Sequence, residues 1–103
     1  MLNWDPENIK EMLKVIIDPE LMINIIDLGL VYEVDVTTEK DVNVTMTLTT
    51  PACPIGPQLA EEVKDVLKEL PGVNNVNVEF TFSPRWDPHV HASEEGRLEL
   101  GIW

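Results

Sequence analysis

Basic side chains are scarce in this sequence of 103 residues. Seven Lys and Arg stand against 19 Asp and Glu, so the formal net charge is -12 at pH 7. A nucleic-acid-binding protein needs a basic patch to meet the phosphates, so we expect no nucleic-acid partner. The acidic balance equally argues against binding to an anionic membrane surface. It fits a protein whose partners are basic or whose ligands are metal cations.

Cysteine is scarce too, and long hydrophobic runs are absent. Cys53 is the single cysteine, so the chain cannot form an internal disulfide and does not require an oxidising compartment. The apolar runs fall far short of the ~20 residues that cross a bilayer. Residues 1–6 contain neither the basic nor the apolar region of a secretory signal. We therefore expect a cytoplasmic protein with no membrane partner, and the length predicts one domain over residues 1–103.

Hydrophobic periodicity predicts two long helices. The first runs from about Pro6 to Ile17, with Asp5 as its N-cap and Pro19 as the stop signal. The residues expected on its inner face are Ile9, Met12, Leu13 and Ile16. The second helix runs from about Pro54 to Leu70. The residues expected on its inner face are Leu59, Val63, Val66, Leu67 and Leu70.

Alternating apolar and polar residues predict three strands, over residues 30–37, 42–49 and 75–82. The polar residues 38–41 predict a hairpin turn, and the helix between the last two strands makes those strands parallel. The apolar residues expected on one face are Leu30, Tyr32, Val34, Val36, Val42, Val44, Met46, Leu48, Val76, Val78, Phe80 and Phe82. A short final helix is predicted to start at Ser93. The fold class is therefore an α+β two-layer sandwich, of order α-β-β-α-β-α, with a small mixed three-stranded sheet.

The most informative segment for chemistry is Thr49-Thr50-Pro51-Ala52-Cys53-Pro54. If Pro54 is the first helical residue, Cys53 is the N-cap, where free N–H groups and the helix dipole favour a thiolate. A thiolate binds metal or attacks sulfur, and the hydroxyls of Thr49 and Thr50 can donate hydrogen bonds to it. The alternative is that Cys53 is a small buried core residue, a common environment for a free cysteine.

Two further groups of side chains invite a metal site. Asp18 and Glu20 flank a proline and could bind a cation, although the residues alone favour hydrogen bonds from aspartate to backbone N–H groups in turns. His89 and His91 could join Cys53 at a metal, but their spacing matches neither a zinc-finger nor a helical ligand pattern. A single cysteine also cannot hold an iron–sulfur cluster alone, so any such role needs a second subunit, a partner or external thiols.

Several ordered motifs together resemble one protein family. They are Asp18-Pro19-Glu20, Asp27-Leu28-Gly29-Leu30-Val31-Tyr32, residues 47–54, Leu70-Pro71-Gly72-Val73, Pro84-Arg85-Trp86 and Leu100-Gly101-Ile102-Trp103. The set resembles the SufT/PaaD-like family, whose members are small proteins of iron–sulfur cluster assembly, akin to eukaryotic cytosolic iron–sulfur targeting factors. The resemblance implies an α+β domain of the iron–sulfur assembly type. It also implies a site formed by Asp18, Glu20, Thr49, Thr50 and Cys53.

The resemblance further implies an accessory factor that helps to assemble clusters or transfer them to client proteins. Cys53 would be the transient thiolate ligand of iron or of an iron–sulfur cluster, and the partners would be the assembly machinery, client apoproteins and a second copy of the chain. Three alternatives stay open. One is a PaaD-like subunit that supports a ring-oxygenase complex, and another is a thiol enzyme in which His89 or His91 serves Cys53 as base. The third is a pure interaction module in which Cys53 is structural.

Overall fold

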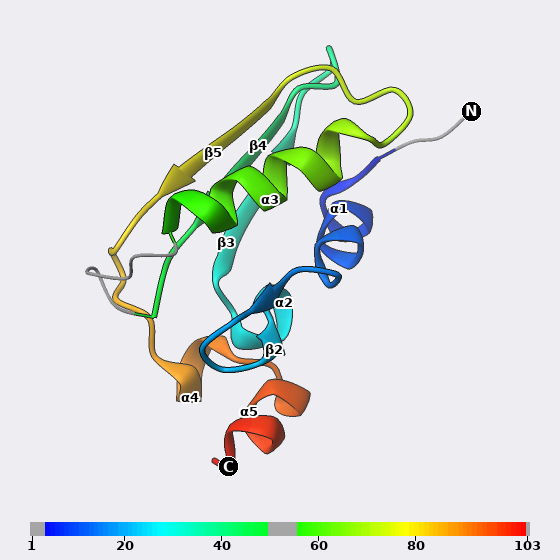
Figure 1. The fold of residues 1–103 in the computed structure, drawn as a ribbon. Helices are drawn as coiled ribbons and strands as arrows, with labels where there is room; N and C mark the ends of the chain where they lie inside the picture. Colours follow the sequence, from blue (N-terminus) through cyan, green and yellow to red (C-terminus); the bar gives the residue numbers. More distant parts are fainter. Residues whose placement is uncertain (1–3, 50–55, 103) are drawn as a thin grey trace.

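A three-stranded sheet forms the centre of the molecule. The computed structural model describes residues 4–49 and 56–102. The strands β3 (Val31–Val36), β4 (Val42–Met46) and β5 (Val76–Phe80) lie in that order across the sheet. The helices α1 (Pro6–Leu13) and α3 (Gly56–Lys68) pack against it, since α1 contacts β3 and α3 contacts β5 (Figure 1). The predicted two-layer α+β architecture is confirmed.

The sheet is mixed, as the sequence predicts. β3 pairs antiparallel with β4, and the turn between them is closed by a hydrogen bond from the Thr37 N–H to the Asp41 carbonyl, at 2.9 Å. β4 pairs parallel with β5, with Val44 opposite Val78. The pairing is parallel because α3 carries the chain back to the end of the sheet where β4 begins. One irregularity interrupts the β3–β4 register, between Val31 and Glu33. A bulge of this kind redirects the side chains beside it, here near Tyr32.

The first helix is shorter than predicted. Its N-cap is Asp5, whose carboxylate accepts the Asn8 N–H at 2.8 Å, but the helix ends at Leu13 and not near Ile17. Ile17 belongs instead to strand β1 (Ile17–Asp18), which pairs antiparallel with β2 (Ile23–Asn24). The β-branched run Val15-Ile16-Ile17 favours extended backbone, which explains why the helix stops early.

Two short helices also escaped the sequence prediction. The four-residue α2 (Ile25–Leu28) follows β2 directly, and its N-cap Asn24 accepts two backbone N–H groups. The four-residue α4 (Pro88–His91) starts after its N-cap Asp87. The predicted final helix is confirmed as α5 (Glu94–Leu100). Its N-cap is Ser93, whose hydroxyl oxygen accepts the Gly96 N–H at 3.0 Å.

The core lies between the helices and one face of the sheet. Its fully buried side chains include Ile9, Leu13, Ile25, Leu28, Leu30, Val42, Val44, Met46, Leu59, Val63 and Leu67. Three residues expected inside are exposed: Met12 at 38%, Phe80 at 36% and Phe82 at 40%. Phe80 pairs with Met46, the last residue of β4, and Phe82 lies beyond it, so no further strand residue covers these rings.

The structure also bears on membranes. Within residues 4–49 and 56–102, no helix combines the length and the apolar character needed to cross a bilayer.

The helix α3 supplies a direct test of this packing. Leu67 is fully buried in the core, so Leu67→Ala should lower the free energy of unfolding by roughly 2–5 kcal/mol, the usual cost of such a cavity. Lys68 is the exposed neighbour on the same helix, and Lys68→Ala should change the free energy of unfolding by less than about 0.5 kcal/mol. Chemical denaturation measures both values, and equal effects would contradict the helix orientation.

Candidate functional site

Asp18 holds the turn between β1 and β2 in shape. Its side chain is only 2% exposed, and one carboxylate oxygen accepts the N–H of Glu20 at 2.8 Å and that of Leu21 at 3.2 Å. Its carbonyl accepts the Met22 N–H at 2.7 Å. Met22 adopts a left-handed backbone conformation, with φ of 59°, which a residue with a Cβ rarely adopts. The bonds to Asp18 therefore stabilise a tight turn.

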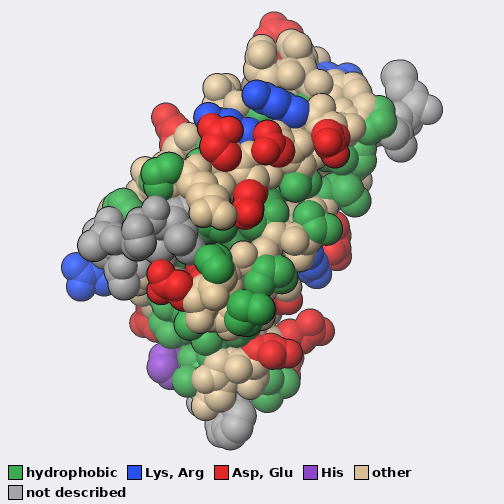
Figure 2. Space-filling model, in the orientation of Figure 1, with side chains coloured by type: hydrophobic (Ala, Val, Ile, Leu, Met, Phe, Trp, Pro, Cys, Tyr) green, Lys and Arg blue, Asp and Glu red, His purple; other side chains and the backbone are tan. Residues whose placement is uncertain are grey.

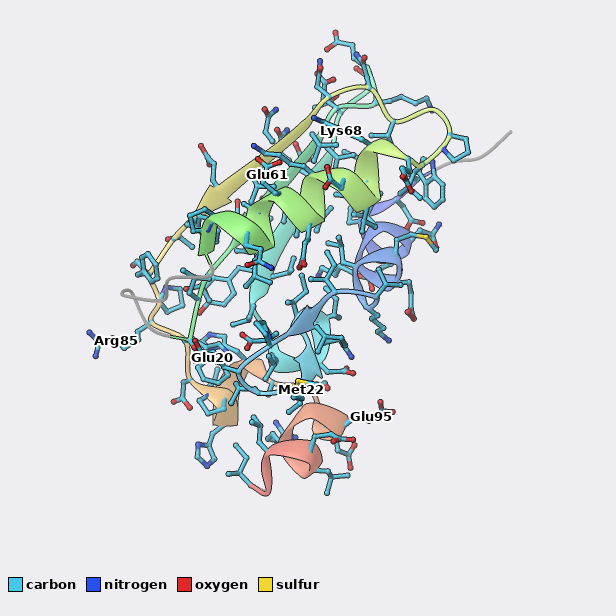
Figure 3. All side chains as sticks on the ribbon, viewed as in Figure 1. Glu20, Met22, Glu61, Lys68, Arg85 and Glu95 are labelled. Atoms are coloured by element: carbon cyan, nitrogen blue, oxygen red, sulfur yellow. The ribbon has the colours of Figure 1, made fainter. Side chains whose placement is uncertain are left out.

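Glu20 lies on that same turn with an exposed side chain. In Figure 3 it is on the side of the molecule that also presents Arg85. Asp18 thus positions the backbone of Glu20, while the Glu20 carboxylate faces outward. Of the two, Glu20 has the accessible carboxylate, and Asp18 has already committed one oxygen to backbone N–H groups.

The end of β4 is fixed against the start of α3. Leu48 is buried, and its Cδ1 would lie 2.9 Å from a Cβ placed on Gly56. Only glycine permits this close approach without a shift of the leucine. Thr49 follows Leu48 and is half-buried. Thr50 and Cys53, the other residues expected in the site, lie outside the described residues.

Asp27 joins α2 to the C-terminal helix. Its two carboxylate oxygens accept the Asn24 side-chain amide at 2.7 Å and the Ser93 hydroxyl at 2.9 Å. The Asp27 carbonyl also accepts the Ser93 N–H at 2.8 Å. These bonds commit Asp27 to structure, so it is not available as a free metal ligand.

A polar cluster around Tyr32 lies at this same C-terminal end of β4, because Val31 pairs with Met46 and the Thr47 N–H donates to the Leu30 carbonyl. The Tyr32 hydroxyl donates to the Pro84 carbonyl at 3.0 Å, and the Tyr32 ring packs on His91 with 4.9 Å between centroids. Burial raises the pKa of Tyr32 above its ordinary 10.0, while the Thr47 hydroxyl acts in the opposite direction. Thr47 lies close without reaching hydrogen-bonding geometry, and its buried hydroxyl has no partner within the part of the chain that is described. Tyr32 therefore stays a neutral hydrogen-bond donor at neutral pH.

The segment 84–91 is anchored by its own side chains. The Trp86 indole N–H donates to the Leu28 carbonyl at 2.7 Å, so this tryptophan packs against the core. His91 accepts the Asp87 N–H on Nδ1 at 2.9 Å, and the exposed His89 places its Nδ1 3.5 Å from an Asp87 oxygen. Neither histidine joins a cluster of three or more potential metal ligands among residues 4–49 and 56–102.

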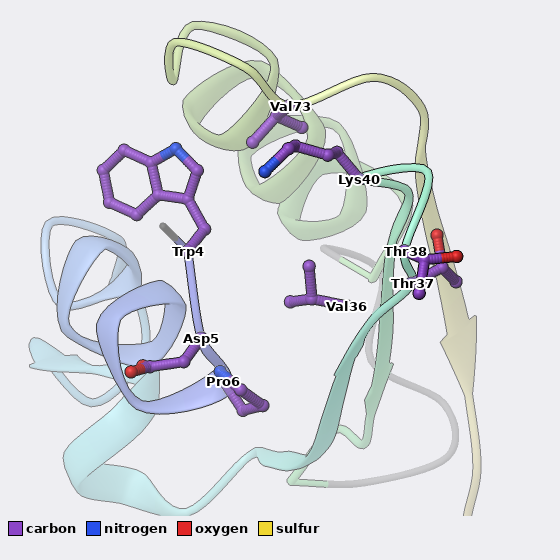
Figure 4. Close-up of a pocket in the computed structure, with 8 residues that line it drawn as sticks. All are labelled: Trp4, Asp5, Pro6, Val36, Thr37, Thr38, Lys40 and Val73. Carbon is purple, nitrogen blue, oxygen red and sulfur yellow. The ribbon is translucent and has the colours of Figure 1, made fainter. Parts of the chain in front are cut away.

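A separate cavity of about 340 Å³ lies where the N-terminal segment meets the β3–β4 turn (Figure 4). Trp4, Lys40 and Val73 line it with the first residues of α1 and the end of β3. The Trp4 indole N–H donates to the Pro71 carbonyl at 2.7 Å, which fixes one wall. Of the expected site residues that the structure describes, Asp18, Glu20 and Thr49 do not line this cavity.

Sequence reasoning missed the structural roles of Asn24, Tyr32 and Ser93. Asn24 precedes a four-residue helix that is too short for a periodic signal. Tyr32 was read as one residue of a strand face, although its hydroxyl needs a partner when it is buried. Ser93 was expected as a helix cap, but its second bond, to Asp27 in a distant segment, has no local sequence signal.

The turn at Asp18 gives a stability prediction. Asp18→Ala removes the acceptor for two N–H groups in a partly buried turn and should cost about 1–3 kcal/mol of unfolding free energy. Asp18→Asn keeps one acceptor oxygen and should cost less. Asp35→Ala is the control, because Asp35 is an exposed acidic residue on β3. Denaturant titration compares the three, and an Asp18→Ala cost equal to that of the control would contradict this role.

Comparison with known proteins identifies the family. The family model described as iron-sulfur cluster assembly protein matches residues 6–80. The chain is 44% identical to a Porphyromonas gingivalis protein named Fe-S protein maturation auxiliary factor, over 93% of this chain and 90% of that one. It is 43% identical to the Staphylococcus aureus Fe-S protein maturation auxiliary factor SufT, over 85% and 99%.

The fold is also similar to solved structures. A domain of unknown function from Bacillus anthracis superposes with a TM-score of 0.88 at 34% identity, covering 95% of this chain and 92% of that one. A conserved protein from Thermotoga maritima superposes with a TM-score of 0.81 at 38% identity, covering 97% of each. With the family model spanning α1 to β5, these matches show that the chain belongs to the iron–sulfur cluster assembly protein family.

Proposed function

We propose that this protein is an accessory factor in the maturation of iron–sulfur proteins, and that Cys53 is the thiolate that transiently receives iron or a cluster. The family membership and the relatives named Fe-S protein maturation auxiliary factors support the role in iron–sulfur assembly. In this role iron or the cluster is cargo. The protein itself catalyses no bond rearrangement on an organic substrate.

The observation that carries the role of Cys53 is its place beside the junction of β4 and α3. Cys53 lies three positions before Gly56, the first described residue of the 13-residue α3, and four positions after Thr49. The packing of Gly56 on Leu48 anchors both sides of the intervening segment. A residue at the start of a long helix is near the positive end of the dipole, which favours a thiolate.

The other expected site residues have supporting roles in this proposal. Asp18 fixes the turn that presents Glu20, and the Glu20 carboxylate orients the Cys53 segment or contacts the incoming iron. Hydroxyls of Thr49 and Thr50 donate hydrogen bonds to the sulfur. Such bonds and the helix dipole act in the same direction, because both stabilise the negative charge of a thiolate.

The thiol-enzyme alternative requires a histidine free to act as a base. His91 already accepts a backbone N–H on Nδ1 and packs its ring on Tyr32, while His89 is exposed beside Asp87. The contacts of His91 give it a structural role, which favours the accessory function. The proposed partners are iron–sulfur assembly proteins and client apoproteins in the cytoplasm. Because each chain has one cysteine, a cluster held by this protein alone would bridge two copies.

Replacement of Cys53 tests the proposal. Cys53→Ser should abolish support of client maturation, because a serine hydroxyl stays protonated at neutral pH and is a poor iron ligand. The fold should persist, since serine is a good N-cap. The readout is the activity of an iron–sulfur client enzyme in cells that depend on this protein, together with the thermal unfolding midpoint of the variant.

Ala52→Ser is the matched control, because it adds a hydroxyl to the same segment and leaves the thiol in place. It should support client activity as the unaltered protein does. Normal client activity with Cys53→Ser would show that the thiolate role is wrong and that Cys53 is structural.

A further inference from the structure

An apolar groove lies between α3 and the connection from α1 to β1. Its volume is about 410 Å³, and it is lined by Val15, Ile16, Ile17, Glu62, Asp65 and Val66. Two of its apolar side chains are unusually accessible, Val15 at 70% and Ile17 at 42%. Apolar side chains that gather on a surface beside polar ones commonly mark a binding site.

The flank of α3 that faces the groove is acidic. Leu59, Val63 and Leu67 form the buried stripe of this helix. Glu62 and Asp65 line the groove together with Val66, and Glu69 follows at helical spacing. The opposite flank carries both signs, because Glu61 lies there with Lys64 and Lys68.

The space-filling view shows the same arrangement. Acidic side chains follow α3, and hydrophobic side chains gather beside them (Figure 2). Two lysines adjoin lining residues in sequence. Lys14 has its ammonium 3.2 Å from a carboxylate oxygen of Glu11, and Lys64 directly precedes Asp65. The groove itself combines an apolar floor with an acidic wall.

We propose that this groove binds a segment of a partner protein that carries apolar side chains flanked by Lys or Arg. The apolar side chains would cover Val15, Ile17 and Val66, and the basic ones would meet Glu62 and Asp65. Charge complementarity selects this occupant, because a second copy of this chain carries the same net charge of -12. A segment rich in Asp or Glu would be repelled for the same reason.

Both walls of the groove are adjacent in sequence to residues of the candidate site. This part of the inference rests on the proposed function. Ile17 directly precedes Asp18, and α3 begins at Gly56, three residues after Cys53. At 1.5 Å per residue, Glu62 and Val66 lie about 9 and 15 Å along the helix from Gly56. A client or assembly protein held in the groove would therefore contact the helix that follows the Cys53 segment in sequence and the strand that carries Asp18.

Fluorescence anisotropy with a designed probe tests the groove. The probe is a labelled amphipathic peptide of about four helical turns, with Leu on one face and Lys on the other, compared with the same peptide carrying Glu for Lys. The Lys peptide should bind, more weakly at high salt, and the Glu peptide should not. Val15→Ser should weaken binding about fivefold or more, and so should Glu62→Gln combined with Asp65→Asn.

Matched variants separate the groove from general attraction to an acidic protein. Val90 is exposed to the same 70% as Val15, and Val90→Ser should leave peptide binding unchanged. Asp35→Asn combined with Glu39→Gln changes the net charge by the same amount as the acidic groove variants and should have little effect. Equal weakening by these controls would overturn the proposal, and so would equal binding of the Glu peptide.

Two measurements separate this inference from the proposed function. Val15→Ser should lower client maturation in a purified assay at low client concentration and recover at high concentration, whereas Cys53→Ser should not recover. If Val15→Ser leaves maturation unchanged at every concentration while Cys53→Ser abolishes it, the groove proposal fails alone. Sedimentation completes the test. If the protein is a dimer and Val15→Ser dissociates it, the groove is an interface between copies of this chain, and our assignment is wrong.

Discussion

The side chain of Leu48 packs closely on Gly56 where the chain passes from the strand β4 into the helix α3. Leu48 is buried beyond the end of β4, and its methyl group occupies the space that a Cβ on residue 56 would need. The contact closes a seven-residue connection whose ends are both packed on the core. Cys53 belongs to this connection, so the position of its ends depends on the same packing that makes α3 cover the sheet.

A second set of bonds joins the segment before β3 to the C-terminal part of the chain. Asp27 accepts hydrogen bonds from Asn24 and Ser93, which ties α2 to α5, and Trp86 reaches the Leu28 carbonyl from the segment before α4. The bonds from Ser93 and Trp86 join segments far apart in the sequence, and their partners are partly buried. Asp18 shapes the β1–β2 turn, and Glu20 is exposed on it.

The order and type of the long elements could be predicted because their patterns are strong and local. The buried stripe of α3 repeats over about three turns, and the alternation of β4 places Val42, Val44 and Met46 inside. The end of α1 could not be predicted, because the pairing of Ile17 with Asn24 competes with helix continuation. Hydrogen bonds from backbone N–H groups to Asp18 in a turn were predicted from the residues alone. The contacts of Tyr32 depend on tertiary packing and have no local sequence signal.

Anaerobic reconstitution with ferrous iron and sulfide tests most directly whether Cys53 receives the cargo. Visible absorption and the mass in solution should be measured together, without added thiol, for the unaltered protein and for Cys53→Ser. The account predicts cluster absorption in a dimer of the unaltered protein, because each chain supplies one thiolate, and no such absorption with the serine variant. A cluster-loaded monomer, or undiminished binding by Cys53→Ser, would contradict it.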